Sequence, residues 1–255
     1  MTEILNWDHT MIDVTDLENA INYFNGHGFG FTHGGKHEYW GTENALDYFG
    51  MNYIELLTVA DKEQAKQFPY KNNSGIYDAV EDYFNGIQRF TTFAIRSNNI
   101  EATHRRLANA GIDVGDITSG KRVDPDGNLI QWKIFYVNDN LPNNLPAPFF
   151  IQWGEPDPQR KQTLTKKGLI KSHAAGDLCV KQAIFNVENP QAVAQELGKM
   201  LITTPLRDGD NYVINISNRQ FIFKHGSENR IVKLVFNGAK KKTTLQLDQI
   251  EFELK

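Results

Sequence analysis

Residues 6–18 read Asn-Trp-Asp-His-Thr-Met-Ile-Asp-Val-Thr-Asp-Leu-Glu, and this stretch sets the beginning of the fold. Its first part, residues 6–14, has the aromatic and β-branched side chains that favour a strand. Thr15 and Glu18 then have the spacing of a capping box, in which both side chains satisfy free backbone amides where a helix starts. The stretch therefore predicts a strand followed directly by a helix.

The residues that follow complete a small unit. The predicted helix has one apolar stripe, made by Leu17, Ile21 and Phe24. Three strand candidates come next, at residues 30–40, 44–49 and 52–59. The first part of the chain is therefore expected to form a βαβββ module.

The same order of elements recurs along the chain. A second copy has predicted strands at residues 90–96, 112–117, 129–137 and 148–153, with a helix capped near Asn98. A third copy has predicted strands at residues 181–187, 212–217 and 221–225, with a helix starting at Asn189-Pro190. Two further strands, at 231–236 and 244–254, suggest a partial fourth copy. This repetition predicts an α+β fold of repeated βαβββ modules.

The repeats suggest two domains. Residues 1–160 are expected to hold two paired modules, and residues 178–255 a C-terminal βαβββ-like domain. The segment 154–177 contains Pro156, Pro158 and several lysines, and it is interpreted as a linker.

Composition excludes several classes of protein. Hydrophobic residues make up 40% of the 255-residue chain and the formal net charge is −4, as in an ordinary globular protein without a basic face for nucleic acid. Lys240, Lys241 and Lys242 are expected at a solvated hairpin tip. Cys179, the single cysteine, is expected to be a buried thiol. With no apolar run near the ~20 residues of a membrane span, a cytoplasmic location is predicted.

Strand alternation places two candidate catalytic side chains on one face. In the first strand one face carries Trp7, His9, Met11 and Asp13, and in Asn52–Val59 one face carries Tyr53, Glu55 and Leu57. The helix should cover the opposite face, so His9 and Glu55 are expected to project into a shared hollow. A buried glutamate must be paired, hydrogen-bonded or bound to metal. Glu55 is thus expected either to pair with a cation such as His9 or to act in chemistry.

The second copy offers weaker counterparts to these two residues. A shift of 83 positions places Thr92 opposite His9. Matching Phe150-Ile-Gln-Trp153 to Tyr53-Ile-Glu-Leu56 places Gln152 opposite Glu55. Of the two, Gln152 could donate a carbonyl oxygen to a metal.

A third histidine lies in a glycine-flanked stretch. His37 is followed by Trp40 and Asn44, a mixture that suits the mouth of a cleft. His37 is expected either to contact a ligand there or to be a structural hydrogen-bonding group. Together with His9 and Glu55 it could form the two-histidine, one-carboxylate set that binds iron or manganese.

Several motifs resemble a known family. The βαβββ repeat with His9 and Glu55 resembles the vicinal oxygen chelate superfamily, which includes glyoxalase I, extradiol dioxygenases and antibiotic-resistance proteins. The motifs Gly34-Gly-Lys-His37, Trp40-Gly-Thr42, Pro148-Phe-Phe-Ile-Gln-Trp-Gly154 and Ser172-His-Ala-Ala-Gly176 are similar to those of bacterial proteins with a glyoxalase-like domain.

The resemblance implies a fold and a kind of site. Two modules pair into an incomplete barrel that holds a small-molecule ligand, and modules of this kind can also pair between the chains of a homodimer. Metal-using relatives bind one divalent metal (Zn, Ni, Mn or Fe) through the first and fourth strands. The corresponding positions here are His9, Glu55, Thr92 and Gln152, and Thr92 departs from that pattern.

Three functions remain open from the sequence. The first is a divalent-metal-dependent lyase, isomerase or dioxygenase acting on a small oxygenated compound. The second is a metal-free protein that binds or sequesters a small molecule in a cleft lined by Trp7, Trp40, Tyr53 and Trp153. The third is a metal-free enzyme in which His9 and Glu55 form an acid–base pair.

Overall fold

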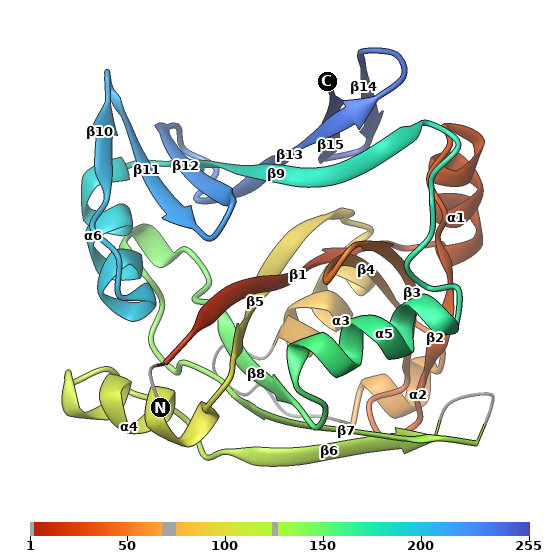
Figure 1. Cartoon of the computed structure of the whole chain (residues 1–255), viewed down its shortest axis with the longest axis horizontal. Coiled ribbons are helices and arrows are strands. Elements are labelled where there is room, and N and C mark those ends of the chain that lie inside the picture. The colour runs from red at the N-terminus through yellow and green to blue at the C-terminus, as the bar shows by residue number, and fades with distance from the viewer. Residues whose placement is uncertain (1–2, 68–74, 124–126) are drawn as a thin grey trace.

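The computed structural model describes residues 3–67, 75–123 and 127–255. Its core is built from two sheets, one with the strand order β2-β3-β4-β1-β5-β8-β7-β6 and one with the order β10-β11-β12-β9-β13-β15-β14. The second sheet lies across one side of β1 and β5, and β6 and β7 lie on the other side (Figure 1). The expected α+β architecture of repeated modules is confirmed.

The first module follows the sequence expectation closely. Its elements are β1 (Leu5–Asp13), α1 (Leu17–Gly26), β2 (Thr32–His37), β3 (Thr42–Phe49) and β4 (Asn52–Val59), and β4 pairs in parallel with β1. The helix cap differs from the prediction. Asp16 rather than Thr15 caps α1, because its carboxylate accepts the amide of Asn19 at 2.9 Å.

The second module repeats this topology. Its elements are β5 (Arg89–Ser97), α4 (Ile100–Asn109), β6 (Thr118–Val123), β7 (Leu129–Phe135) and β8 (Phe149–Trp153). The strand expected at residues 112–117 is wrong: that segment contributes only a bridge from Val114 to Val137, and β6 starts after it. Antiparallel pairing of β1 with β5 joins the two modules into one eight-stranded sheet.

This sheet curls until its two edges meet. Arg122 on edge strand β6 donates from Nη1 to the carbonyl of Gly34 on edge strand β2 at 2.7 Å. The sheet is therefore an incomplete barrel with a concave inner face, as expected for paired modules.

The C-terminal part contains the third module and a partial fourth. The third consists of β9 (Gly176–Val187), α6 (Pro190–Leu201), β10 (Leu206–Asp208), β11 (Asn211–Ile216) and β12 (Arg219–His225). The partial copy has β13 (Arg230–Ala239), β14 (Thr243–Leu247) and β15 (Ile250–Leu254), with no helix between its described strands. Residues 240–242 form the exposed tip between β13 and β14.

Aromatic packing joins the two sheets. Trp7 and Phe93 from the first sheet both contact Phe221 from the second, each with ring centroids 4.9 Å apart. Phe24 of α1 stacks on Phe252 of β15 at 4.7 Å. These rings are almost fully buried and belong to one apolar cluster that spans both sheets. The convex face of the first sheet is thus closed, which leaves the concave face for a ligand.

Further short helices complete the described chain. They are α2 (Lys62–Ala65), α3 (Gly75–Asn85), a 3₁₀ turn at Pro142–Asn144 and α5 (Asp157–Lys166). Helix α3 packs against β1, β4 and β5, and α5 lies within the segment interpreted as a linker. None of the helices in the described ranges is long and apolar enough to cross a bilayer.

One expectation about the core is wrong. Cys179 is exposed, because alternation along β9 buries Leu178 and Val180 and turns the thiol between them outward.

Candidate active site

The concave face of the first sheet contains a cavity of about 590 Å³. The first module supplies its polar wall, with His9 from β1, Glu55 from β4 and Asn44 from β3. Other lining residues that the sequence had indicated are His37, Trp40, Tyr53 and Trp153. His9 and Glu55 therefore share one hollow on the side opposite α1.

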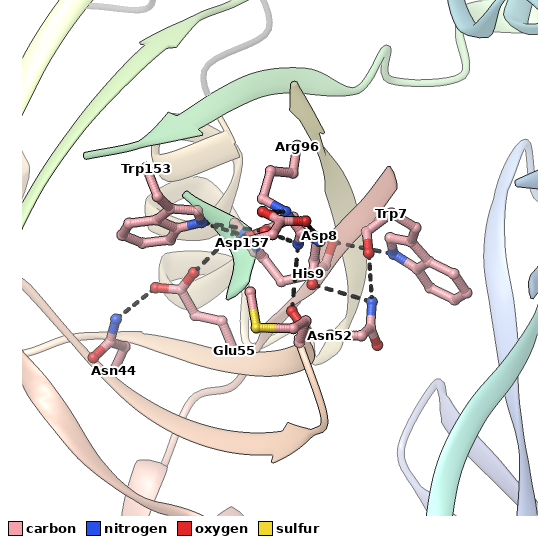
Figure 2. Close-up of polar contacts among 10 residues, drawn as sticks. Trp7, Asp8, His9, Asn44, Asn52, Glu55, Arg96, Trp153 and Asp157 are labelled. Carbon is pink, nitrogen blue, oxygen red and sulfur yellow. Dashed lines mark hydrogen bonds and ion pairs between the residues drawn. The ribbon is translucent and has the colours of Figure 1, made fainter. Parts of the chain in front are cut away.

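Trp7 is not part of this wall, and its prediction as a ligand-binding residue is wrong. The pairing of β1 with β5 shifts register between Trp7 and His9, so strict alternation fails at that point. The Trp7 ring is 1% exposed and packs against Phe221 of the second sheet. In Figure 2 it points to the side opposite Trp153 and Glu55.

His9 is held in place on four sides. Its Nδ1 lies 2.8 Å from Oδ1 of Asp8, and its Nε2 lies 3.6 Å from Oε2 of Glu55. Tyr53 stacks on the imidazole with centroids 4.4 Å apart, and Phe149 meets it edge-on at 5.4 Å. The ring thus has a fixed orientation between two carboxylates (Figure 2).

Asp8 is a buried carboxylate with strong partners. Its Oδ2 accepts from Nη1 of Arg96 at 2.7 Å and from Nε1 of Trp153 at 3.2 Å. Burial acts to raise the pKa of Asp8, but the hydrogen bond from His9 and the positive charges around it outweigh burial and lower that pKa to about 2. Asp8 is therefore ionised at neutral pH, which assigns a proton to Nδ1 of His9.

Arg96 is itself fixed by a second acid. Its Nε and Nη2 donate to the two oxygens of Asp157 at 2.8 and 2.9 Å. This bidentate pair connects β5 to the start of α5. The result is a chain of contacts from Asp157 through Arg96, Asp8 and His9 to Glu55 (Figure 2).

Sequence reasoning did not identify Asp8 and Arg96. Alternation assigned Asp8 to the face opposite His9, and the register shift beside which these two side chains meet has no signature in the sequence. The one available signal was the adjacent Asp8-His9 pair, since a carboxylate beside a histidine often orients it.

Glu55 has one oxygen committed and one facing the histidine. Its Oε1 accepts from Nδ2 of Asn44 at 2.6 Å, while Oε2 faces His9. The side chain is 12% exposed, and it lines the cavity. Glu55 can therefore touch a bound molecule directly.

His37 lines the same cavity. Its Nδ1 lies 3.0 Å from the hydroxyl of Thr42, so it makes the structural hydrogen bond that was one of its two expected roles. Burial lowers the pKa of His37 below its usual range, and the nearby charge of Glu55 only partly opposes this. Trp40 lies beside it in the lining.

The two second-module candidates lie elsewhere, and both predictions are wrong. The Thr92 hydroxyl donates to the carbonyl of Ala147 at 3.1 Å. Gln152 points to the helix side of the sheet, where its Oε1 accepts the amide of Ile100 at 2.7 Å at the start of α4. Neither side chain lines the cavity.

Strand register gives the physical reason. In the first module His9 pairs with Tyr53, and in the second module Ala94 pairs with Phe149. The residues equivalent to His9 and Glu55 are therefore Ala94 and Ile151. The expected alignment was off by two residues along β5 and by one along β8, and the one-residue slip moves Gln152 to the other face of the sheet.

These residues do not fit the divalent-metal site that the resemblance implies. The second module contributes Ala94 and Ile151, which carry no donor atoms. The first module offers two donor atoms, Nε2 of His9 and Oε2 of Glu55, because Nδ1 of His9 is bonded to Asp8 and Oε1 of Glu55 to Asn44. Two donors are fewer than the three protein ligands of a catalytic metal site. Within residues 3–67, 75–123 and 127–255, no three His, Cys, Asp or Glu side chains converge in a way that could hold a metal ion.

Comparison with solved structures gives a likeness in fold. A hypothetical protein from Staphylococcus aureus superposes with a TM-score of 0.86 at 22% identity, covering 99% of both chains. Methylmalonyl-CoA epimerase from Mycobacterium tuberculosis superposes with a TM-score of 0.41 at 17% identity, over 61% of this chain and 91% of that one. No curated protein matches the sequence.

Comparison with protein-family profiles identifies the family of this chain. The profile described as "Glyoxalase-like domain" matches residues 7–201, which include both paired modules and the start of the third. This agrees with the paired βαβββ topology and with the motifs that suggested the resemblance. The chain therefore belongs to the glyoxalase-like domain family, within the vicinal oxygen chelate superfamily.

Proposed function

We propose that this protein is a metal-independent acid–base enzyme that moves a proton on a small oxygenated compound. The observation that carries the proposal is the Asp8–His9–Glu55 array at the wall of the cavity, with contacts of 2.8 and 3.6 Å. Isomerisation or elimination next to a carbonyl group is the reaction class that such a pair serves.

The two groups have complementary positions for this chemistry. Glu55 is the base, because it lines the cavity and Asn44 holds its Oε1, which leaves Oε2, beside His9, to take a proton. It takes the proton from a carbon beside the carbonyl, and the electron pair of the C–H bond passes to the carbonyl oxygen. In the imidazolium form, which the carboxylates of Asp8 and Glu55 on either side stabilise, Nε2 of His9 donates a hydrogen bond to that oxygen. In an isomerisation, Glu55 then returns the proton to the former carbonyl carbon, while the hydroxyl proton of the first carbon passes to the former carbonyl oxygen. In an elimination, the electron pair re-forms the carbonyl and the substituent one carbon further along leaves with its bonding pair and takes the proton.

The cost of the array supports catalysis over simple binding. Asp8 and Arg96 are both charged and at most 6% exposed. Desolvating these two charges costs free energy, and their arrangement fixes the orientation of His9. A pocket that only binds an apolar ligand does not require such an arrangement.

A second candidate function is metal-free binding or sequestration of a small molecule. One observation favours it: strands β7 and β8 of the second module present the apolar and aromatic side chains Trp132, Phe149 and Ile151 to the cavity. A cytoplasmic location and a homodimer stay predictions alongside either function.

Deuterium exchange would separate these functions. We would incubate the protein in D₂O with small hydroxyketones and 2-keto acids and follow C–H signals by NMR, with and without a chelator. We expect chelator-resistant exchange that falls at least about 100-fold in Glu55→Gln, because the base is removed without changing its size. Thr92→Val, a change outside the cavity, is the matched control.

Other outcomes would decide against the proposal. Saturable binding without exchange would favour sequestration. Exchange that a chelator abolishes and that Zn²⁺, Ni²⁺, Mn²⁺ or Fe²⁺ restores would overturn metal independence. Metal content of protein purified without an affinity tag or added metal supplies the independent readout.

A further inference from the structure

A second cavity, of about 530 Å³, adjoins the first. The two share the side chains of Leu46, Tyr48, Arg122 and Trp153 as lining. Helix α5 closes one side of the second cavity, and β6 and β7 close another. A molecule longer than the first cavity can therefore extend along Trp153 into the second.

Arg160 on α5 is the unusual group in this second cavity. The residue is 6% exposed, and its guanidinium carbon lies 3.5 Å above the ring centroid of Trp153. Its guanidinium makes no hydrogen bond or ion pair to any residue in the described ranges, in contrast to Arg96, which binds two carboxylates. Among the described residues, the ionised Asp8 offsets this charge only through space, without a hydrogen bond. A buried cation without a directly bonded carboxylate is costly, so an anion that joins it gains a strong partner.

A second arginine faces the same space. Arg122 on β6 donates one N–H to the Gly34 carbonyl at 2.7 Å, and the described residues give it no carboxylate partner. Among the described lining residues the one acid is Glu155, and it accepts from the hydroxyl of Thr163 at 2.9 Å rather than from either arginine. Within the part of the chain that the structure describes, neither arginine of this cavity is therefore paired with a carboxylate.

We propose that the second cavity binds the anionic head group of the substrate, a carboxylate or a phosphate. Stacking on Trp153 leaves the N–H edge of Arg160 free for two parallel hydrogen bonds to such an oxyanion. The rest of the molecule then passes Trp153, whose Nε1 contacts Asp8, and reaches His9 and Glu55. For the reacting end, this inference rests on the proposed function.

Direct titration with simple anions tests the inference. Inorganic phosphate and acetate would each be titrated into the protein at constant ionic strength in chloride, with heat and tryptophan fluorescence as readouts. We expect saturable binding that weakens at least about tenfold in Arg160→Met, because a desolvated charge-assisted bond is lost. Arg105→Met, at an exposed arginine on α4, should bind like the wild type.

Comparing the two anions identifies the head group, and a second variant with a test of folding excludes misfolding as the cause of lost binding. Tighter binding of phosphate assigns a phosphate substrate, and tighter binding of acetate assigns a carboxylate. Arg122→Met is a second variant, and circular dichroism establishes that each variant is folded. Binding that is absent, or equal in wild type and folded Arg160→Met and Arg122→Met, overturns the inference.

A further variant separates this inference from the proposed function. Glu55→Gln should lose deuterium exchange and keep its affinity for the anion. Exchange in the wild type without anion binding would contradict the head-group site and leave the proposed function standing. Anion binding in the wild type without exchange on any compound would remove only the acid–base function.

Discussion

The two modules that wall the cavity share one topology but carry different side chains at their paired strand positions, polar in the first and apolar in the second. In the first, the paired positions on β1 and β4 present His9, Tyr53 and Glu55 to the hollow. In the second, the equivalent positions on β5 and β8 are Ala94, Phe149 and Ile151. The duplicated backbone is thus compatible with either set of side chains. The difference suggests that the first module reacts with the ligand and the second module determines the shape of the space that holds it.

A charge placed at the apolar positions of the second module is expected to have the largest effect on stability. Ile151→Glu puts a carboxylate where the native side chain is 4% exposed, in an apolar cluster with Met11 and Phe149. We expect the free energy of unfolding to fall by about 3 kcal/mol or more at pH 7, because an unpaired charge is desolvated. Urea unfolding measures the loss.

The pH dependence distinguishes charge from shape in that variant. Burial raises the folded-state pKa of an introduced glutamate, so its cost is small at pH 4 and grows as the pH rises above the unfolded value of about 4.3. Ile151→Gln has the same shape without a charge, and its cost should not change with pH. Equal losses for both variants at pH 7 would show that the charge had found a partner or water.

The converse experiment removes a buried negative charge from the first module. The folded pKa of Asp8 is about 2, below its ordinary value of 3.8, so its ionisation stabilises the fold above pH 4, and this contribution is lost as pH falls toward 2. We expect Asp8→Asn to lower the free energy of unfolding by about 2 kcal/mol or more at pH 7, because Arg96 and His9 lose a buried counter-charge.

An acid titration of stability checks this assignment. The difference in the free energy of unfolding between wild type and Asp8→Asn should narrow between pH 4 and pH 2, because protonation of Asp8 removes from the wild type the charge that the variant lacks. A gap that stays constant over that range would mean that Asp8 contributes by packing alone. Asp210→Asn, at an exposed carboxylate, is the control.

The sequence predicted the regular parts of this half-barrel because they follow simple periodicity. The bounds of β4, Asn52–Val59, agree with its alternating apolar residues, and His9 and Glu55 were brought together by the same rule. Predictions failed where a register changed. The bulge after Trp7 turned that ring into the core, and a one-residue slip moved Gln152 to the helix side.

Contacts distant in sequence could not be predicted in this way. Arg96 reaches Asp157 across 61 residues, and His173 reaches Asp47 across 126 at 2.9 Å. His173 lies in one of the family-like motifs, yet its partner became apparent only in three dimensions, where the pair ties the chain after α5 to β3. Periodicity describes faces of single elements, while such pairs depend on how elements are placed.

The smallest predicted effect concerns an acid of β1 that lies outside the cavity. Asp13 is 1% exposed, on the strand against which α3 packs. Among the described residues no group makes a well-formed hydrogen bond to its carboxylate, although Thr91 and Asp82 lie close enough to affect its pKa. Burial raises the pKa of Asp13 well above its ordinary value, and the negative charge of Asp82 raises it further. The folded protein therefore loses stability as pH rises from about 4 toward that raised pKa, because the unfolded chain ionises first.

Asp13→Asn should remove that penalty while keeping the shape of the side chain. We expect the variant to be more stable than the wild type by about 1 kcal/mol at pH 7, with the difference vanishing near pH 4. Urea unfolding at both pH values measures it, with the same Asp210→Asn control. A variant less stable at pH 7 would show that Asp13 is an ionised, partnered carboxylate like Asp8, and that the polar character of β1 extends beyond the cavity to its end.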